Sequence, residues 1–526
     1  MRHHATAAAL TLALLAGIAA PVLARPNQPA KPSPDEQVKA LVEKYAEYRR
    51  KDNYTRLRMN VIRDLGKHKL PRARKALFKI LRATKSPDER ILAVGSIARI
   101  ADAEAAENLT AAVVARKTPE LFHELGGALG RSNDPGVKAW LAGTALDARQ
   151  PILLTALIRA VGLQRLEGAL PRLTKHYGDG VVDARNVDVL HETVRAIGRI
   201  GGPDAKPLLL KAAVHDKWRI RLAAADVLPH QNAQDKDIHT RIRTLFTDRV
   251  PQVIEALARA VGDARFEAMM PIVIDALEAA PRLRTRDACY RTLKAFSKLD
   301  FHHDAAAWRL WWKHRSDPTK TPKDIQRITF ARYYGGYVGS DRVAFIVDLS
   351  GSMSWPQRKK THRIDVARTQ LFRVLKDIPN GHLFNVIVFS NKVRAWSKRE
   401  QVVDDASRAR ARKWVDKHFA EPDGDTLTYD ALLDTLESNR NCDTIYLLSD
   451  GNPSHGHYKS SEGLRAMVAV RNRYRRVAIH TIALTLLSLD RGRPILSERP
   501  AVMKAFMRAL AADNNGTCQV IERPPK

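Results

Sequence analysis

The chain has 526 residues and a mass of 58.9 kDa, which is too long for one hydrophobic core and fits two or three domains. Hydrophobic residues make up 44% and charged residues 28%, with 27 Gly and 27 Pro, and this composition excludes collagen-like and globally disordered chains. The 88 Lys and Arg exceed the 57 Asp and Glu by 31 charges, so the chain favours acidic partners. Three cysteines without a CxxC spacing exclude a disulfide framework and a structural zinc finger.

Residues 1–24 are typical of a secretory signal peptide. A short basic start precedes an apolar run from Ala5 to Ala20, and Val22-Leu23-Ala24 places small residues at the cleavage position. We therefore expect an exported protein, located in the periplasm, on the cell surface or outside the cell, with residues 25–38 as a linker. An uncleaved membrane anchor is the alternative, because the apolar run approaches the roughly 20 residues that span a bilayer. No later segment is apolar enough to span a membrane, so we expect no transmembrane segment in the mature chain.

From residue 39 to residue 315 the sequence repeats at steps of 30 to 36 residues. The repeated feature is a small or turn-forming residue that closes an amphipathic helical run: Gly66, Ala98, Gly130, Gly162, Gly198, Leu228, Gly262 and Ser297. A repeat of this length predicts stacked helical hairpins, which bury their apolar faces only between neighbours. The units resemble short HEAT-like repeats of bacterial proteins, most clearly over residues 194–208. We therefore predict an all-α solenoid over residues 39–315.

Three tryptophans, Trp308, Trp311 and Trp312, lie at helical spacing at the end of this region and so share one face. We interpret them as a hydrophobic cap on the last repeat, and an exposed aromatic platform for a ligand is the alternative. Residues 316–339 contain Asp-Pro, Thr-Pro and Gly-Gly pairs with weak periodicity, which predicts a connector between two domains.

Past Gly339 the hydrophobic pattern changes from that of helices alone to strands alternating with helices. Short apolar runs typical of buried parallel strands occur at Arg342–Val347, Phe384–Phe389, Thr444–Leu448, Val477–Leu484 and Cys518–Ile521. Stretches of helical period lie between them, near residues 364–374, 404–419, 428–438, 461–475 and 499–511. This alternation predicts an α/β, doubly wound, mostly parallel sheet over residues 340–526.

Three polar motifs fall at the edge where ligands of such sheets bind, the carboxyl ends of the strands. The motifs are Asp348-Leu349-Ser350-Gly351-Ser352, Gly424-Asp425-Thr426 and Ser449-Asp450-Gly451. Carboxylate and hydroxyl oxygens without imidazole or thiolate suit Mg²⁺ or Mn²⁺. Two carboxylates and three hydroxyls only just neutralise such an ion and leave its coordination incomplete, so we expect a further acidic ligand from outside the chain.

The motifs resemble the metal-ion-dependent adhesion site of von Willebrand factor type A (VWA) domains, and the resemblance covers residues 340–526. It implies that Ser350, Ser352 and Thr426 contact a divalent metal, while Asp348 and Asp450 hold it directly or through water. It also implies that the open coordination position captures a Glu or Asp side chain of a partner protein. Asp425 departs from the family pattern, which usually has glycine there, and adds a negative charge beside the site.

Other polar groups carry weaker signals. His455 and His457 lack a third metal ligand, and we interpret them as part of a solvated loop. Four arginines lie at the C-terminal end of the predicted helix near residues 461–475, and we interpret them as a solvated basic face, with a docking patch for an acidic polymer as the alternative: Arg471, Arg473, Arg475 and Arg476. The sequence contains no HExxH, GxSxG or P-loop, and no base lies near the motif serines, so we predict that the protein is not an enzyme.

Three hypotheses of function follow. Residues 336–526 hold 31 Lys and Arg against 21 Asp and Glu, a charge of +10, which leaves +21 on residues 1–335. The first hypothesis is a secreted or envelope adhesion protein that captures an acidic residue of a partner through the metal, with the solenoid as a second binding scaffold. The second is a polyanion binder whose basic solenoid binds nucleic acid or an acidic envelope polymer. A third, enzymatic hypothesis rests on the HEAT-like repeats of bilin lyases and has no catalytic residues to support it.

Overall fold

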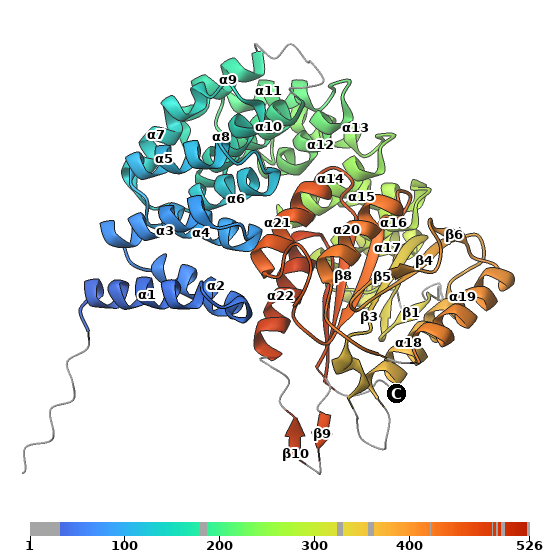
Figure 1. Ribbon diagram of the computed structural model, residues 1–526. Coiled ribbons are helices and arrows are strands. Elements are labelled where there is room, and N and C mark those ends of the chain that lie inside the picture. Colours follow the sequence, from blue (N-terminus) through green and yellow to red (C-terminus); the bar gives the residue numbers. More distant parts are fainter. Residues whose placement is uncertain are drawn as a thin grey trace, which may run out of the picture.

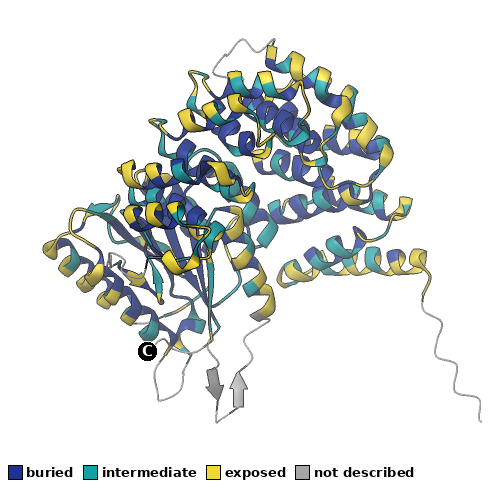
Figure 2. Ribbon diagram, turned by 180° about the vertical axis from the view of Figure 1, so that it is seen from behind, coloured by how far each residue is buried: buried dark blue, intermediate teal, exposed yellow. Residues whose placement is uncertain are grey.

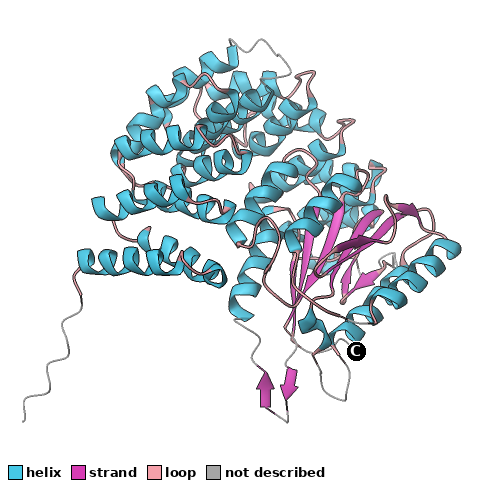
Figure 3. Cartoon of the chain, in the orientation of Figure 1, coloured by secondary structure: helices cyan, strands magenta, loops and turns pink. Residues whose placement is uncertain are grey.

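The structure is a computed structural model that describes residues 32–178, 187–322, 330–355, 362–420, 422–485, 488–490, 493–495 and 500–522. The expected signal peptide, residues 1–24, lies outside these residues. A curved stack of helices leads into a unit built of strands and helices, as Figures 1 and 3 show. Within the described ranges, the structure contains no helix whose length and apolar character would let it cross a membrane.

The helical stack has two layers. The inner layer consists of α2 (Thr55–Leu65), α4 (Pro87–Ile100), α6 (Pro119–Leu129), α8 (Pro151–Gln164), α10 (Val187–Ile200), α12 (Trp218–Val227), α14 (Pro251–Asp263) and α16 (Leu283–Ser297). The outer layer consists of α1 (Pro34–Tyr48), α3 (Pro71–Ala83), α5 (Ala103–Val114), α7 (Pro135–Ala142), α9 (Leu170–Gly178), α11 (Ala205–Ala212), α13 (Lys236–Leu245), α15 (Met270–Ala279) and α17 (Ala305–Lys313). Each inner helix packs on the next inner helix, which confirms the predicted helical repeats.

Proline and small residues shape this stack. Four inner helices, α4, α6, α8 and α14, begin with proline, whose missing N–H costs nothing in the first turn. The repeated small residues lie in or just after the last turn of the inner helices, as predicted. Several are small because the next inner helix comes very close. A Cβ on Gly162 would lie 2.8 Å from the Cα of Ala196, and one on Gly198 would lie 2.2 Å from a methyl of Val227.

The C-terminal unit is a sheet with helices on both faces. Its strands are β3 (Arg342–Asp348), β4 (Leu383–Phe389), β5 (Val393–Ala395), β6 (Gln401–Val402), β7 (Thr444–Ser449), β8 (Ala478–Leu484) and β11 (Cys518–Ile521). The order is β11-β8-β7-β3-β4-β5, with β6 also paired to β4, and the first five strands of this order run parallel. The predicted α/β fold, a mostly parallel sheet, is therefore confirmed.

Successive side chains of each strand point to opposite faces of the sheet, so the core of this unit has two parts, one on each face. Side chains such as Phe345 pack under α18 (Arg363–Asp377) and α19 (Asp405–His418). Side chains such as Ile346 point to the other face, under α20 (Thr428–Ser438), α21 (Ser461–Arg471) and α22 (Pro500–Asp513). On that second face the core continues into the core of the helical stack as one cluster. Figure 2 shows the buried residues following the sheet and the inner sides of the helices.

The predicted connector contains more structure than the sequence indicated. Strands β1 (Arg332–Tyr333) and β2 (Gly336–Tyr337) form a small hairpin, and Tyr333 is fully buried against Phe345 of the sheet. A second hairpin joins β9 (Ser488–Asp490) to β10 (Arg493–Ile495). Short 3₁₀ turns also occur in the described part of the chain: η1 (Asp52–Tyr54), η2 (Thr144–Asp147), η3 (Glu167–Ala169), η5 (Leu228–His230), η6 (Glu267–Met269), η7 (Pro318–Lys320) and η8 (Gly351–Ser354).

The tryptophans of α17 act as the predicted cap. Trp308 is fully buried against Phe301, and its indole N–H donates to the carbonyl of His302 at 2.9 Å. Trp311 is also buried, while Trp312 is half-buried beneath the guanidinium of Arg315.

The α/β unit contacts both ends of the helical stack and also its middle. At the N-terminal end, Asp88 of α4 accepts hydrogen bonds from the N–H groups of Lys459 (2.7 Å) and Ser460 (2.9 Å), at the start of α21. Arg63 of α2 pairs with Glu462 at 3.0 Å. At the other end, Arg284 of α16 donates to the carbonyl of Arg476 at 2.5 Å. The α/β unit therefore bridges the two ends of the arc of inner helices.

The arginines after α21 form the middle of this contact, so the predicted solvated basic face is wrong. Arg473 pairs with Glu192 of α10 at 3.1 Å, and Arg476 pairs with Asp226 of α12 at 2.5 Å. Arg475 donates to main-chain carbonyls at the end of α20, including that of Asn439 at 2.9 Å. Of the four, Arg471 alone is exposed. The acidic partners of Arg473 and Arg476 are distant in the sequence and belong to the other domain.

Candidate metal centre

The topology of the sheet brings two of the three polar motifs together. Strands β3 and β7 are parallel neighbours in which Val347 pairs with Leu448. Asp348 is the last residue of β3, and Asp450 directly follows β7. Both carboxylates therefore lie at the carboxyl edge of the central strands, as predicted, and both side chains are buried.

The loop after β3 folds back toward its own aspartate. The N–H of Ser350 donates to Oδ1 of Asp348 at 2.8 Å, which holds the carboxylate in place. The N–H of Gly351 donates to the carbonyl of Gly424 at 3.0 Å, and this bond joins the first motif to the second. Ser352 then lies in the 3₁₀ turn η8.

Hydrogen bonds connect the serines and aspartates directly. The hydroxyl of Ser352 donates to Oδ1 of Asp450 at 2.7 Å and lies 3.2 Å from the hydroxyl of Ser350. On the far side, the hydroxyl of Ser449 donates to Oδ2 of Asp348 at 2.5 Å. Four of the five predicted metal ligands therefore meet in one network, together with Ser449.

Thr426, the fifth predicted ligand, lies beside this network. Its N–H donates to the hydroxyl of Ser454 at 2.9 Å, and a Cβ on Gly451 would lie 3.7 Å from its hydroxyl. Among the described residues, no hydrogen bond joins the Thr426 side chain to the other four. Asp425, where the family usually has glycine, accepts a contact of 3.1 Å from the ring of His455. His455 and His457 are exposed, and their loop contributes to the site through Ser454.

Arg363, which the sequence analysis did not single out, is part of the site. This residue at the start of α18 is only 1% exposed, and its guanidinium donates to Oδ2 of Asp450 at 2.6 Å. The guanidinium also lies over the ring of Trp355. A buried arginine at the first position of an amphipathic helix carries no sequence signal of its own, because the same residue is usually solvated there.

The electrostatics of the site favour a cation. Burial, together with the nearby carboxylate of Asp450, raises the pKa of the Asp348 carboxyl. Two carboxylates and one guanidinium leave the ionised network with one negative charge in a buried position. The ligand set contains only oxygen, so its chemistry fits a hard divalent cation such as Mg²⁺ or Mn²⁺. Among the described residues, no cluster of three or more His, Cys, Asp or Glu side chains could hold a metal, and the candidate centre contains only two such side chains.

Comparisons with known proteins agree with this architecture. The von Willebrand factor type A domain family matches residues 341–519. The C-terminal part of the chain is therefore a VWA domain, and a long region of helical repeats precedes it. A VWA domain suggests binding to other proteins, and domains of this family often bind a divalent metal. No match was found among the curated proteins.

Solved structures resemble parts of the chain. A von Willebrand factor type A protein from Catenulispora acidiphila is 18% identical and covers 35% of this chain, with a TM-score of 0.28. The chain spans 38% of the length of that protein. A mutant of the PilB minor pilin from Streptococcus sanguinis is 15% identical, with coverage of 39% of this chain and 59% of the pilin and a TM-score of 0.26. The RO (RSR) protein of Deinococcus radiodurans is 13% identical, with coverage of 85% and 93% and a TM-score of 0.21.

Proposed function

We propose that the protein is a metal-dependent protein-binding protein, acting outside the cytoplasm, and that it has no catalytic activity. A divalent cation, Mg²⁺ or Mn²⁺, would be held by Asp348, Ser350, Ser352, Thr426 and Asp450. The cation would supply an open coordination position for a Glu or Asp side chain of the partner. The helical repeats would serve as a rigid second scaffold.

The observation that carries this proposal is the convergence of two buried carboxylates and two serine hydroxyls at one edge of the sheet. The Ser352 hydroxyl already contacts both Asp450 and the hydroxyl of Ser350. These oxygens are of the type that a hard divalent cation prefers, and they gather at a site where Asp348 is fully buried. Of the five candidate ligands, Ser352 is half-buried and the other four are buried, so the network reaches solvent at Ser352.

Arg363 supports the choice of an acidic partner. With Asp348 and Asp450 ionised and Arg363 charged, a bound divalent cation would change the net charge of the network from −1 to +1. A buried excess of positive charge attracts a carboxylate and disfavours a cationic side chain. The partner is therefore expected to present Glu or Asp to the site.

Isothermal titration calorimetry of the full chain with MgCl₂ or MnCl₂ tests the metal centre. We expect one binding event that is abolished in Asp348→Ala. The matched control is Asp423→Ala, which removes an exposed carboxylate from the adjacent loop and should leave the binding unchanged. Circular dichroism checks that both variants are folded. Equal heats from the wild type and Asp348→Ala would overturn the proposal.

A further inference from the structure

A large cleft lies between the helical repeats and the VWA domain, away from the metal centre. Its volume is ≈ 1320 Å³, and its walls are the inner helices from α2 to α14 on one side and α21 with residues 472–476 on the other. Fourteen Lys and Arg line it against seven Asp and Glu. We call it the arginine cleft, after Arg99, Arg159, Arg195, Arg199, Arg259 and Arg473.

The repeat itself produces this concentration of charge. Arg159, Arg195 and Arg259 occupy the same place in their repeats, three residues before the glycine near the end of the inner helix. Arg199 stands one residue after the glycine of its repeat, as Arg99 stands one residue after Ala98. Because successive inner helices lie side by side, equivalent positions form rows along the wall of the cleft.

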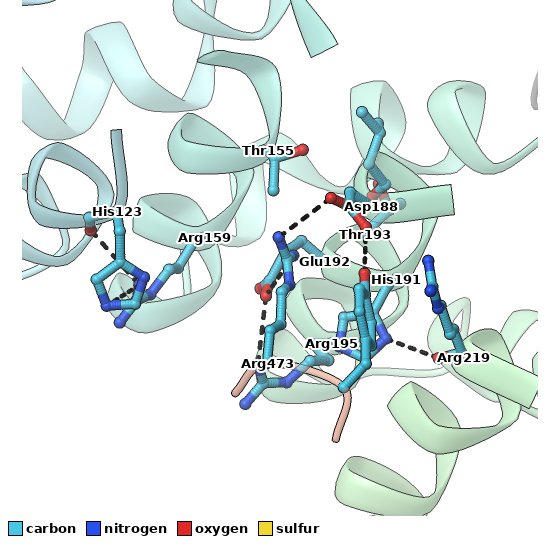
Figure 4. Close-up of polar contacts among 12 residues, drawn as sticks. His123, Thr155, Arg159, Asp188, His191, Glu192, Thr193, Arg195, Arg219 and Arg473 are labelled. Carbon is cyan, nitrogen blue, oxygen red and sulfur yellow. Dashed lines mark hydrogen bonds and ion pairs between the residues drawn. The ribbon is translucent and has the colours of Figure 1, made fainter. Parts of the chain in front are cut away.

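Some of the arginines serve the contact between the domains. Figure 4 shows Glu192 between Arg195 and Arg473, with N···O distances of 3.2 Å and 3.1 Å. Asp226 likewise lies between Arg476 at 2.5 Å and Arg195 at 3.4 Å. The two acidic residues deepest in this contact are therefore already shared by several guanidinium groups.

Other arginines of the cleft have no carboxylate partner within the described residues. Arg159 contacts the ring of His123, with Nη1 2.6 Å from Nδ1, as Figure 4 shows. Burial and the charge of Arg159 lower the pKa of His123, so the ring is neutral and brings no negative charge. Arg199 and Arg259, both half-buried, make no hydrogen bond or ion pair within the described part of the chain.

These unpaired charges are held at a cost in free energy. Burial and the like charge of Arg195 lower the pKa of Arg199 to about 10. Burial and the like charge of Arg476 lower the pKa of Arg259 to about 10 in the same way. Nearby carboxylates, among them Asp226, offset only part of this cost, and an anion bound among the guanidinium groups would reduce it further.

Guanidinium groups also indicate the chemistry of the anion. Their planar N–H forks bind the oxygens of phosphate in pairs, which a single ammonium group cannot do. A nucleic acid strand would also need aromatic faces on which its bases stack. The aromatic side chains of the lining do not offer them, since Phe122 is buried and the face of Tyr474 is covered by the guanidinium of Arg219 at 4.3 Å.

We propose that the arginine cleft binds a multivalent oxyanion, a small molecule that carries several phosphate groups, through Arg159, Arg199 and Arg259. This site is separate from the metal centre and goes beyond the proposed capture of a partner carboxylate. The bound anion would lie against both the repeats and the segment after α21, and it would reinforce the contact between the two domains.

Calorimetric titration of the full chain with sodium tripolyphosphate tests the site, in EDTA so that no divalent cation binds the probe. The test variant is the double change Arg199→Gln and Arg259→Gln. Neither arginine forms an ion pair in the described part of the chain, so the change takes no ion-pair partner away from a carboxylate. Each guanidinium should contribute about tenfold in affinity, so the variant should bind roughly 100-fold more weakly. The control is Arg243→Gln with Arg249→Gln, an equal loss of charge at exposed positions outside the cleft.

One tripolyphosphate per chain, lost in the cleft variant and kept in the control, would support the proposal. Binding that is equal in wild type and cleft variant, or equally weakened in both variants, would overturn it. Tighter binding of an oligothymidylate than of tripolyphosphate, lost in the cleft variant, would overturn it in favour of a nucleic acid strand. Asp348→Ala should bind the probe normally, so failure of the metal centre and failure of the cleft are distinguishable.

Discussion

At the scale of single residues, Arg363 determines the charge of the metal centre. Its guanidinium is as deeply buried as the carboxylate of Asp450 to which it donates. A buried ion pair adds little net stability, yet removal of one partner leaves an isolated buried charge. Arg363 therefore stabilises the site without metal and reduces the negative charge that attracts a cation.

Replacement of Arg363 by methionine separates these two effects. We expect Arg363→Met to lower the free energy of unfolding by about 3–5 kcal/mol in EDTA, because Asp450 loses its buried partner. Mg²⁺ should then raise the melting temperature of the variant by more than that of the wild type, since the network has one more negative charge. Thermal unfolding with and without Mg²⁺ measures both effects.

The matched control is Arg368→Met on the same helix. Arg368 forms a partly exposed ion pair with Asp365 at 2.8 Å, and such pairs contribute only about 0–1 kcal/mol. An equal gain from Mg²⁺ in wild type and Arg363→Met would contradict the role of Arg363.

We expect a buried histidine to make the stability of the VWA domain depend on pH. Burial lowers the pKa of His480 to about 3, and its Nδ1 accepts a hydrogen bond from the N–H of Thr517 at 3.1 Å. The imidazole of the unfolded chain titrates near 6.5, so below that pH the unfolded state binds more protons than the folded state. The stabilising contribution of neutral His480 is therefore complete above about pH 6.5 and is lost as the pH falls toward 3.

His480→Asn keeps a hydrogen-bond acceptor at this position but does not titrate. Between about pH 7 and pH 5, the free energy of unfolding measured in urea should fall less steeply in the variant than in the wild type. The difference between the two slopes should be up to about 1.4 kcal/mol per pH unit. The exposed His230→Asn should follow the wild type. If both variants follow the wild type, His480 is not a source of the acid sensitivity.

At the scale of secondary-structure elements, the close approach of neighbouring inner helices explains the period of the repeats. Glycine normally weakens a helix by about 1 kcal/mol relative to alanine. Gly162 lies inside α8, and a Cβ there would come within 2.9 Å of the Cβ of Ala196 on α10. The small residue is therefore retained because the helices pack on each other at this point.

We expect Gly162→Ala to destabilise the protein by about 1–3 kcal/mol despite the better helix propensity of alanine, because the next helix must shift. Gly127→Ala in α6 is the control: its Cβ would meet only the ends of two flexible side chains, Arg131 at 3.5 Å and Arg159 at 3.8 Å, so the change should be neutral or stabilising. Chemical denaturation of both variants decides between packing and propensity, and equal effects of the two changes would contradict the packing explanation.

The strands of the VWA domain were predictable because they lie in the centre of a sheet. Continuous apolar runs such as Arg342–Val347 and Thr444–Leu448 differ from the observed strands by one residue at most. The predicted ligands Asp348 and Asp450 follow from the same reasoning, since both occur where such a strand ends. Their placement at one edge agrees with the prediction, and metal binding by them stays a prediction.

At the scale of the whole molecule, the contact between the domains could not be predicted. Periodicity shows which face of a helix is apolar, but it does not show which distant element covers a charged residue. Arg473 and Arg476 look like a solvated basic face in sequence, yet their partners Glu192 and Asp226 belong to the other domain. The hairpin β1-β2 escaped prediction for a similar reason, because its tyrosines are buried only by tertiary packing.

The two candidate binding sites lie in different parts of the protein. The VWA domain carries the candidate metal centre on a sheet edge, while the repeats contact the domain through α21 and together with it line the arginine cleft. Capture of a partner through a single carboxylate on a metal should tolerate salt and fail with chelator, whereas binding of a polyanion by many arginines should weaken steeply as salt rises.

The most direct measurement is capture of proteins extracted from the native cells by the immobilised full chain, with Mg²⁺ or EDTA and at low or high salt. We expect a specific partner to be captured in Mg²⁺ even at high salt, and to be lost in EDTA and in the folded double variant Ser350→Ala and Ser352→Ala. Capture that persists in EDTA and in this variant but vanishes at high salt would contradict a metal-dependent function.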